Sequence, residues 1–318
     1  MSFYAGKKIL VTGGTGLIGR PLVEMLVAQG AKVTVITLDD IPEPNGADYY
    51  TMDLREFRNC QYACVGQEIV FQIAGIKGSP VATKTKTASF FVPTLQFSTN
   101  MMEAARRARV GWYLNTSSVG VYGPAEIFHE DDAWEDKPST HDKFAGWAKR
   151  IGEMQAEAYK IEFGWDCVSI VRPANVYGPW DSFEDESAMV IPSLIKRACY
   201  GDGPFTVWGD GSPIRDFIHA RDVARGMMIM VEKQVREPVN LGSGVGVTIK
   251  ELAYIISPKV EWDTSKPNGD AKRLMDTKRA ESYGFKPEIS LKDGIRETLD
   301  WYIEHRDYTG RYSPFKEG

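Results

Sequence analysis

The feature that most constrains the fold is a glycine-rich segment near the start of the chain, VTGGTGLIGR, in which Gly13, Gly16 and Gly19 are spaced as GxxGxxG. It follows a short β-branched, apolar run at 8–12 and precedes a stretch at 21–29 with helical spacing of its apolar residues. Glycines between a strand and a helix permit a tight turn, close approach of backbone N–H groups to a pyrophosphate, and close packing of the helix on the strand. The segment therefore predicts a dinucleotide-binding loop.

The remaining pattern alternates between strands and helices. Further apolar runs, separated by helix-like stretches such as 99–109 and 148–163, stand at 32–37, 68–73, 112–115 and 167–171. Such alternation implies right-handed crossovers and a parallel sheet. After Arg172 the chain is irregular, with short helical pieces at 193–200 and 223–233 and strand-like pieces at 205–208 and 238–241. We predict a doubly wound α/β fold with a Rossmann domain at 1–172 and a smaller α/β substrate-binding region at 173–318, the chain crossing between them.

Composition excludes several other classes of protein. The chain has 318 residues, 43% of them apolar, and its net charge of −5 with no Lys/Arg cluster opposes nucleic-acid binding. It begins without the basic and apolar regions of a signal peptide, and no apolar run reaches the roughly 18 residues of a membrane span. We therefore expect a cytoplasmic protein with no membrane partner. The four cysteines, Cys60, Cys64, Cys167 and Cys199, lack CxxC spacing, and we expect no metal site.

The end of the second strand bears on the choice of dinucleotide. An acidic residue there holds the ribose hydroxyls of NAD. The place falls near Thr37, with Asp39 and Asp40 just beyond and no Arg or Lys in between, which favours NAD over NADP. Asp53 could face the adenine or cap a helix, and both interpretations stay open.

Several motifs beyond the glycine loop resemble the extended short-chain dehydrogenase/reductase family of NAD-dependent nucleotide-sugar epimerases and dehydratases. They are TSSVGVYGP at 116–124, RPANVYGP at 172–179 and WGDGSPIRDFIHARDVARG at 208–226. GPWDSF, VIPSLIKR and DTSKPNGDAKRLMD look like the GDP-sugar branch, especially GDP-fucose synthases. The resemblance covers nearly the whole chain. It implies an NAD-dependent enzyme for a nucleotide-linked sugar, and a homodimer formed by the helices at 99–109 and 148–163.

The same resemblance assigns contact residues. Those implied for the cofactor are Gly13, Thr15, Gly16, Leu17, Ile18, Gly19, Thr37, Asp53, Leu54, Ala74 and Lys149. Those implied for the substrate are Lys77, Asn175, Val190, Lys196, Trp208, Arg215, Lys266 and Arg273. Arg215 and Arg273 are the candidates for the diphosphate, because a guanidinium matches phosphate bidentately.

The catalytic positions depart from the family pattern at one residue. The family uses a Tyr-x-x-x-Lys pair with a Ser or Thr, in which the phenolate takes a hydroxyl proton as hydride passes to the nicotinamide. Lys149 and Ser118 hold two of these positions, but Ala145 stands where the family has its Tyr. Because a methyl group cannot exchange a proton, the chain carries an engineered inactivating substitution, uses another group, or has lost ordinary turnover. The groups available are Ser118, a water, Tyr122, His141 and Lys149.

The type of reaction follows by elimination within the family. The 4,6-dehydratases need an Asp-Glu pair where this chain has Val119 and Gly120, and GDP-fucose synthases need a Cys and a His where it has Val119 and Trp180. What survives is hydride transfer at one carbon, C4, by a 4-dehydrogenase, a 4-ketoreductase or a 4-epimerase. Of these we favour simple oxidation or reduction, and the resemblance implies a GDP-hexose or GDP-heptose as the substrate. The alternatives are a nucleotide-sugar 4-epimerase and, because of Ala145, an impaired variant or a binding protein.

Overall fold

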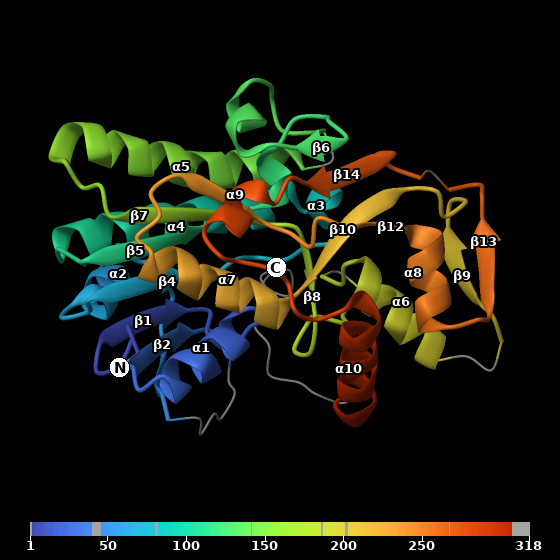
Figure 1. Ribbon diagram of the computed structural model, residues 1–318, viewed down its shortest axis with the longest axis horizontal. Coiled ribbons are helices and arrows are strands. Elements are labelled where there is room, and N and C mark those ends of the chain that lie inside the picture. The colour runs from blue at the N-terminus through green and yellow to red at the C-terminus, as the bar shows by residue number, and fades with distance from the viewer. Residues whose placement is uncertain are drawn as a thin grey trace.

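The computed structural model describes residues 2–39, 46–79, 82–140, 142–185, 187–200, 203–266 and 268–306. A seven-stranded sheet forms its centre (Figure 1), and every strand pair in it is parallel. In spatial order the strands are β11 (Pro238–Leu241), β7 (Val168–Pro173), β5 (Trp112–Thr116), β4 (Ile69–Gln72), β1 (Lys8–Thr12), β2 (Lys32–Thr37) and β3 (Asp48–Thr51). The order reverses between β1 and β4, which is where ligands bind in doubly wound sheets.

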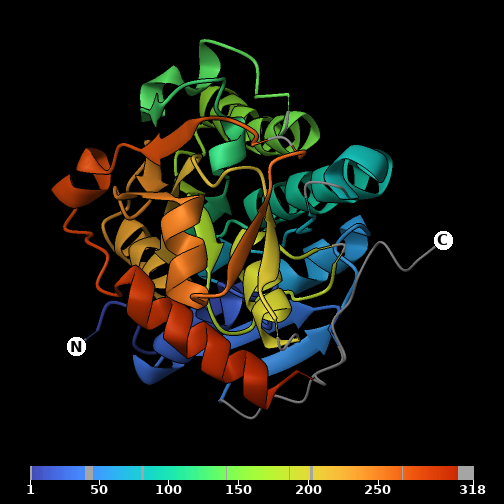
Figure 2. The same ribbon diagram turned by 90° about the vertical axis from the view of Figure 1, so that its right-hand side faces the viewer.

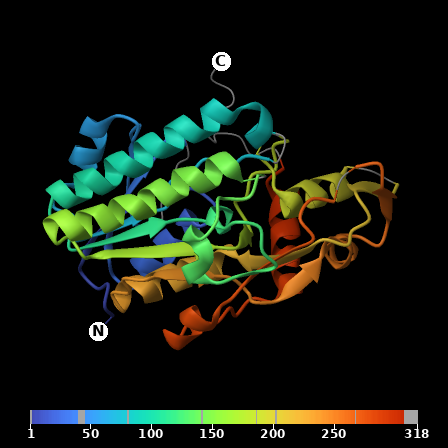
Figure 3. The same ribbon diagram turned by 90° about the horizontal axis from the view of Figure 1, so that it is seen from above.

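Helices cover both faces of this sheet, as Figure 3 shows. One layer contains α2 (Phe57–Cys64), α4 (Thr87–Arg107) and α5 (Lys143–Phe163), and the other contains α1 (Gly19–Ala28) and α7 (Ala220–Glu232). Each layer has its own apolar core: Leu10 packs with Met101 on one face, whereas Ile9 packs with Leu22 on the other. The alternation along β1 follows from the two-residue period of a strand. The predicted doubly wound α/β fold is confirmed.

Two smaller sheets are formed mostly by the C-terminal part of the chain, with β6 (Ile127–Phe128) contributed by an earlier segment. The first runs β12 (Gly246–Thr248), β10 (Ile214–His219), β14 (Lys272–Met275) and β6, with β8 (Asn175–Tyr177) also paired to β10. The second pairs β13 (Val260–Asp263) with β9 (Phe205–Trp208). The helices of this part are α6 (Val190–Cys199), α8 (Ile249–Ile256), α9 (Lys278–Ser282) and α10 (Leu291–Glu304). α6, α8 and α10 pack together around Leu194, Leu252 and Ile295 (Figure 2).

The start of α4 and the place of β11 differ most from the expectations, and α5, α6 and α7 each begin three to five residues earlier than expected. α4 begins twelve residues before the expected start at Thr99, because Pro93 lies inside the helix instead of ending it. β11 comes from the C-terminal half of the sequence yet pairs with β7, Val239 opposite Val171, so the chain returns to the central sheet after residue 173. Short turns of helix complete the fold at α3 (Ala82–Thr85), η1 (Val119–Val121) and η2 (Glu130–Trp134).

Candidate active site

A cavity of about 780 Å³ opens at the carboxyl ends of the central strands and continues toward α6 and β14. Its size lies in the range of pockets for small molecules and cofactors. One end is lined by the glycine loop after β1 and the other by residues of the C-terminal region, so a single hollow joins the two parts. All the predicted cofactor residues line it, as do the substrate candidates Lys77, Asn175, Val190, Lys196 and Arg273.

The glycine loop has the geometry that a dinucleotide needs. Gly13 has φ +67°, and a Cβ there would lie 2.9 Å from Cα of Ala74 in the next loop. A Cβ on Gly19 would collide with the carbonyl of Gly13, where α1 begins. Both positions therefore require glycine, and the loop leads directly into the N-terminal end of α1, where a helix favours a negatively charged group. The residues present fit a bound dinucleotide.

Two carboxylates flank the place expected for the adenosine. Asp39, just after β2, accepts a hydrogen bond of 2.6 Å from Thr15 Oγ1, and its backbone N–H donates to Thr37 Oγ1 at 3.0 Å. Asp53, after β3, is bound by Arg55 Nε at 2.8 Å. Burial opposes the effect, but Arg55 holds the pKa of Asp53 below its usual range. Asp39 thus occupies the acidic position at the end of the second strand, whereas Asp40 lies outside the described residues.

The two predicted catalytic side chains lie together on the cavity wall with Ala145. Lys149 projects from α5, and its Nζ donates to the carbonyl of Thr116 at the end of β5 (2.8 Å). Burial lowers the pKa of Lys149 to about 8, and the Glu153 carboxylate opposes that shift. Ser118 caps η1 by accepting the N–H of Gly120 at 3.1 Å. Ala145 lies one helical turn before Lys149, as the Tyr-x-x-x-Lys spacing requires, and its methyl packs with Phe90.

The other groups that could have moved a proton are placed elsewhere or are outside the described residues. The Tyr122 hydroxyl donates to Asn240 Oδ1 at 2.6 Å, and Arg172 donates to it at 3.0 Å, within the core. Burial raises the pKa of Tyr122 to about 12, against the effect of Arg172. Its role is therefore packing and hydrogen bonding. His141 lies outside the described residues.

A guanidinium faces the cavity from β14. Arg273 Nη2 lies 2.6 Å from Asp142 Oδ2, at the beginning of α5. Arg215 is its direct neighbour across the parallel pair β10–β14. Burial lowers the pKa of Arg215, and the positive charge of Arg273 adds to the effect. Two adjacent cations at one end of the cavity are suited to a diphosphate, although Arg215 itself is not part of the lining formed by the described residues.

A second ion pair crosses the cavity from the Rossmann side to the C-terminal side. Lys77, in the loop after β4, lies 2.5 Å from Oδ1 of Asp181, whose side chain is 1% exposed. Asp181 also accepts the N–H of Ser182 at 2.7 Å. The buried carboxylate fixes the Lys77 ammonium at the cavity wall, where its other N–H bonds can reach a ligand.

Two predicted substrate residues lie apart from this cavity. Trp208 is 56% exposed, and Lys266 Nζ lies 5.7 Å from the centroid of its ring. Neither belongs to the lining formed by the described residues. Their contact with substrate stays a prediction.

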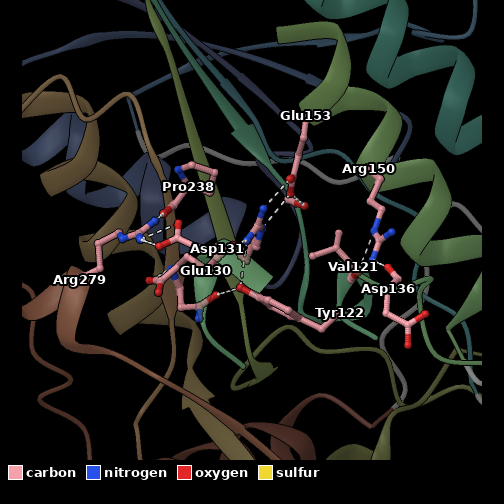
Figure 4. Close-up of polar contacts among 12 residues, drawn as sticks. Val121, Tyr122, Glu130, Asp131, Asp136, Arg150, Glu153, Pro238 and Arg279 are labelled. Carbon is pink, nitrogen blue, oxygen red and sulfur yellow. Dashed lines mark hydrogen bonds and ion pairs between the residues drawn. The ribbon is translucent and has the colours of Figure 1, made fainter. Parts of the chain in front are cut away.

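A network of buried polar groups lies behind the catalytic wall (Figure 4). Glu153, one turn after Lys149 on α5, accepts from Ser117 Oγ at 2.5 Å, and Arg172 of β7 binds its two oxygens at 3.0 and 2.7 Å. Arg150, next to Lys149, donates to the carbonyl of Val121 at 2.8 Å. The network thus ties α5 to the segment that carries Ser118.

Sequence reasoning missed several residues of the cavity wall. Asp142 precedes Ala145 by three residues, a spacing that places both on one face of a helix, and this signal was available. Asp181 stands in GPWDSF, where only Trp180 was considered. Phe183 and Tyr302, which line the cavity with ring centroids 4.3 Å apart, come from segments that no local pattern connects.

The described residues contain no group of three or more His, Cys, Asp or Glu arranged to hold a metal ion. Within the same ranges, no helix has the length and apolar character to cross a membrane.

The doubly wound sheet, the glycine loop and the Ser118–Lys149 pair define an NAD(P)-binding protein of the short-chain dehydrogenase type. The chain belongs to the NAD dependent epimerase/dehydratase family, whose profile matches residues 9–242. Its homologues are NAD(P)-dependent nucleotide-sugar epimerases, reductases and dehydratases, and the chain is an enzyme of this class.

Individual relatives narrow the comparison. The chain is 32% identical to GDP-L-fucose synthase 1 of Arabidopsis thaliana over 94% of both chains. It is 29% identical to dTDP-4-dehydro-6-deoxy-D-allose reductase of Streptomyces bikiniensis, covering 95% of this chain and 98% of the relative. In fold it is similar to UDP-glucose 4-epimerase of Thermotoga maritima, with a TM-score of 0.81, 24% identity and coverage of 94% and 99%. The predicted resemblance to the family is confirmed.

Proposed function

We propose that the chain catalyses NAD-dependent hydride transfer at C4 of a GDP-hexose or GDP-heptose, as a 4-dehydrogenase or 4-ketoreductase. The observation that carries the proposal is that Ser118 and Lys149 share one cavity with the glycine loop, while Val119 and Gly120 line it without a group that exchanges protons with carbon. Trp180 packs instead on Arg20, with 3.4 Å between the guanidinium and the ring centroid. The relative from Streptomyces bikiniensis, named as a reductase of a 4-dehydro sugar, supports chemistry confined to C4.

In the proposed reaction Lys149 transfers the proton and Ser118 orients the C4 oxygen. In the oxidative direction the C4 hydroxyl proton passes to neutral Lys149 Nζ as hydride leaves C4 and the ketone forms; reduction reverses both transfers. Ser118 Oγ donates a hydrogen bond to the C4 oxygen and orients it. A nicotinamide, when bound, supplies the carbon that accepts or donates the hydride. Ala145 leaves room for the sugar or a water beside Lys149.

The preference for NAD rests on Asp39. Its carboxylate lies next to Thr15 and Thr37 on the cavity wall, where it can accept hydrogen bonds from ribose hydroxyls and would repel a 2′-phosphate. We expect Asp39→Asn to lower the ratio of kcat/KM for NAD to kcat/KM for NADP. The control is Asp131→Asn, an exposed carboxylate that pairs with Arg279 away from the cavity lining formed by the described residues. A wild-type enzyme that uses NADP more efficiently than NAD would contradict this assignment.

Two further features belong to the proposal. We place the protein in the cytoplasm, consistent with four cysteines that are all free thiols. We also propose a homodimer through α4 and α5, supported by the exposed apolar residues Met154 and Ile161, which lie seven positions apart on one face of α5.

The decisive experiment follows nicotinamide absorbance while the purified protein is mixed with NAD and, in turn, GDP- and UDP-linked hexoses and heptoses, with and without a 2-oxo acid as hydride acceptor. We expect reduction with a GDP-sugar, a 4-keto product by NMR, and loss of turnover in Lys149→Met. A C4 epimer without net cofactor reduction would favour a 4-epimerase. Sugar binding by calorimetry with no product under any condition would favour a binding protein or an inactivated variant.

A further inference from the structure

The buried network behind the active-site wall connects its two catalytic elements through one side chain. Ser117, immediately before Ser118, donates a hydrogen bond from its hydroxyl group to Glu153 Oε1 at 2.5 Å. Glu153 belongs to the same helix as Lys149 and follows it by four residues, so the two side chains lie on one helical face. A single carboxylate thus fixes the segment that carries Ser118 relative to the helix that carries Lys149.

The carboxylate is itself fixed from a third element. Arg172, at the end of β7 and fully buried, donates Nε to Oε1 at 3.0 Å and Nη2 to Oε2 at 2.7 Å. Its Nη1 donates to the carbonyl of Glu130 at 2.7 Å and to the Tyr122 hydroxyl, so every nitrogen of the guanidinium has a partner. A bidentate pair with further hydrogen bonds has little freedom to move.

We propose that Glu153 is a positioning residue for catalysis: it holds Ser118 through Ser117, holds Lys149 through helix α5, and keeps a negative charge one turn from the Lys149 ammonium. This inference rests on the proposed role of Lys149 as proton acceptor. A buried ion pair is weak evidence for stability, because a well-packed apolar pair of similar volume often stabilises equally well. We therefore assign the Glu153–Arg172 pair a role in positioning the site and not in stabilising the fold.

The charges around both groups bear on the electrostatic part. Lys149 has Glu153 one turn away on its own helix, and it lines the same cavity as two ion pairs, Asp142 with Arg273 and Lys77 with Asp181. Glu153 faces Arg172 of β7, the Tyr122 hydroxyl and Arg150. Glu153 raises the pKa of Lys149 against the lowering by burial. Its removal should therefore make Lys149 easier to deprotonate.

Two variants separate the hydrogen bond to Ser117 from the effect of the Glu153 charge on Lys149. Ser117→Ala removes the link to the serine segment and leaves the ion pair intact; we expect kcat to fall more than tenfold, with KM within twofold and the pH profile unmoved. Glu153→Gln removes the charge; we expect the midpoint of the pH–kcat profile to fall by about two units, the effect of a charge about 6 Å away at an effective dielectric constant of about 20.

The control is Asp222→Asn, which alters another carboxylate that is 2% exposed and bound by Arg225 at 2.9 Å, away from the cavity. It should lower Tm without changing kcat or the midpoint. If Glu153→Gln does not fold, Glu153→Gln with Arg172→Met removes both charges. In that variant the Lys149 midpoint should still lie below that of wild type while kcat falls, because the Glu153 charge that raises the pKa of Lys149 and the anchor from Arg172 are both lost.

A titration independent of turnover distinguishes this inference from the proposed function. In protein with 13C-labelled lysine, the Cε signal that Lys149→Met removes reports the Lys149 pKa directly by NMR. A downward shift in Glu153→Gln supports the electrostatic role even if no sugar is oxidised by wild type. An unshifted Lys149 signal together with an unchanged kcat in Ser117→Ala would reduce Glu153 to a purely structural residue.

Discussion

Lys149 determines how the proposed reaction depends on pH. Because burial lowers its pKa to about 8, the ammonium form dominates below pH 8 and the neutral amine above it. The oxidative rate should rise about tenfold per pH unit below pH 8 and reach a plateau above it, whereas the reductive rate should fall as pH increases through 8. Initial rates in both directions between pH 6 and 10 check this. An oxidative rate that is flat across that range would exclude Lys149 as the proton acceptor.

Ala145 stands at the position where the resemblance to the family implies a tyrosine. Its methyl lines the cavity one turn before Lys149, so a tyrosine there would place its ring in the cavity near the Lys149 side chain. We expect Ala145→Tyr to raise kcat at pH 7 by about 10²-fold, the lower end of what a positioned acid–base group contributes. Ala145→Phe, which fills the same space without a hydroxyl, should stay at or below wild type. Equal kcat in the two variants would contradict the prediction.

Among individual residues, the sequence predicted those that belong to a local motif. It did not predict those whose contacts are with residues far away in the chain. Ser118 and Lys149 were found because each sits in a recognisable segment. The Lys77–Asp181 pair joins residues 104 positions apart, and no pattern in either segment indicates that they meet. Trp208 was assigned to substrate from its motif, and that contact stays a prediction; its exposure of 56% is a property of the folded chain that no local pattern indicates.

Among the elements, the loop between β1 and α1 gives the sharpest test of cofactor binding. Gly13→Ala would force a Cβ onto a backbone with φ +67° and within 2.9 Å of Ala74 Cα. We expect a loss of about 1–3 kcal/mol in stability and at least tenfold weaker binding of NAD. Gly66→Ala is the matched control, because Gly66 has φ +72° but nothing within 4 Å of the added Cβ. Gly66→Ala should lower the stability of the protein but leave its affinity for NAD unchanged. Equal weakening of NAD binding in both variants would contradict a steric role for Gly13.

The extent of α4 shows why element boundaries were harder to predict than element types. Apolar spacing after Thr99 indicated a helix, but Pro93 argues for a break before it, since proline lacks the N–H of an i to i−4 bond. The helix continues through Pro93 because packing compensates: Phe90 and Phe97 are buried, and the Thr94 hydroxyl donates to the Phe90 carbonyl at 2.7 Å. Those contacts come from the tertiary fold.

For the whole molecule, the exposed face of α5 predicts the oligomeric state. Ile161 is 77% exposed and Met154 50%, although both are apolar. If α4 and α5 form the homodimer interface, Met154→Glu with Ile161→Glu should convert a dimer to a monomer in sedimentation velocity at micromolar concentration. Val65→Glu changes an apolar residue that is 72% exposed immediately after α2, and it should leave the dimer intact. A wild-type monomer at that concentration would contradict the proposal.

The overall architecture was predictable from the alternation of strands and helices, but the path of the chain was not. The run at 238–241 was identified as strand-like, yet its partner could not be known, because an apolar run of four residues fits any parallel neighbour. Only the fold shows Val239 opposite Val171 and α7 packed against α1.

The position of β11 also has a consequence for biosynthesis. A ribosome delivers β7 long before β11, and until residue 241 has emerged the buried, apolar β7 presents an unpaired edge. While some seventy further residues are synthesised, the edge of β7 can pair with a neighbouring chain. Its proper partner is β11, the last strand of the central sheet to be made. A chain truncated between these two strands should therefore aggregate, even though β11 lies outside the predicted Rossmann domain at 1–172.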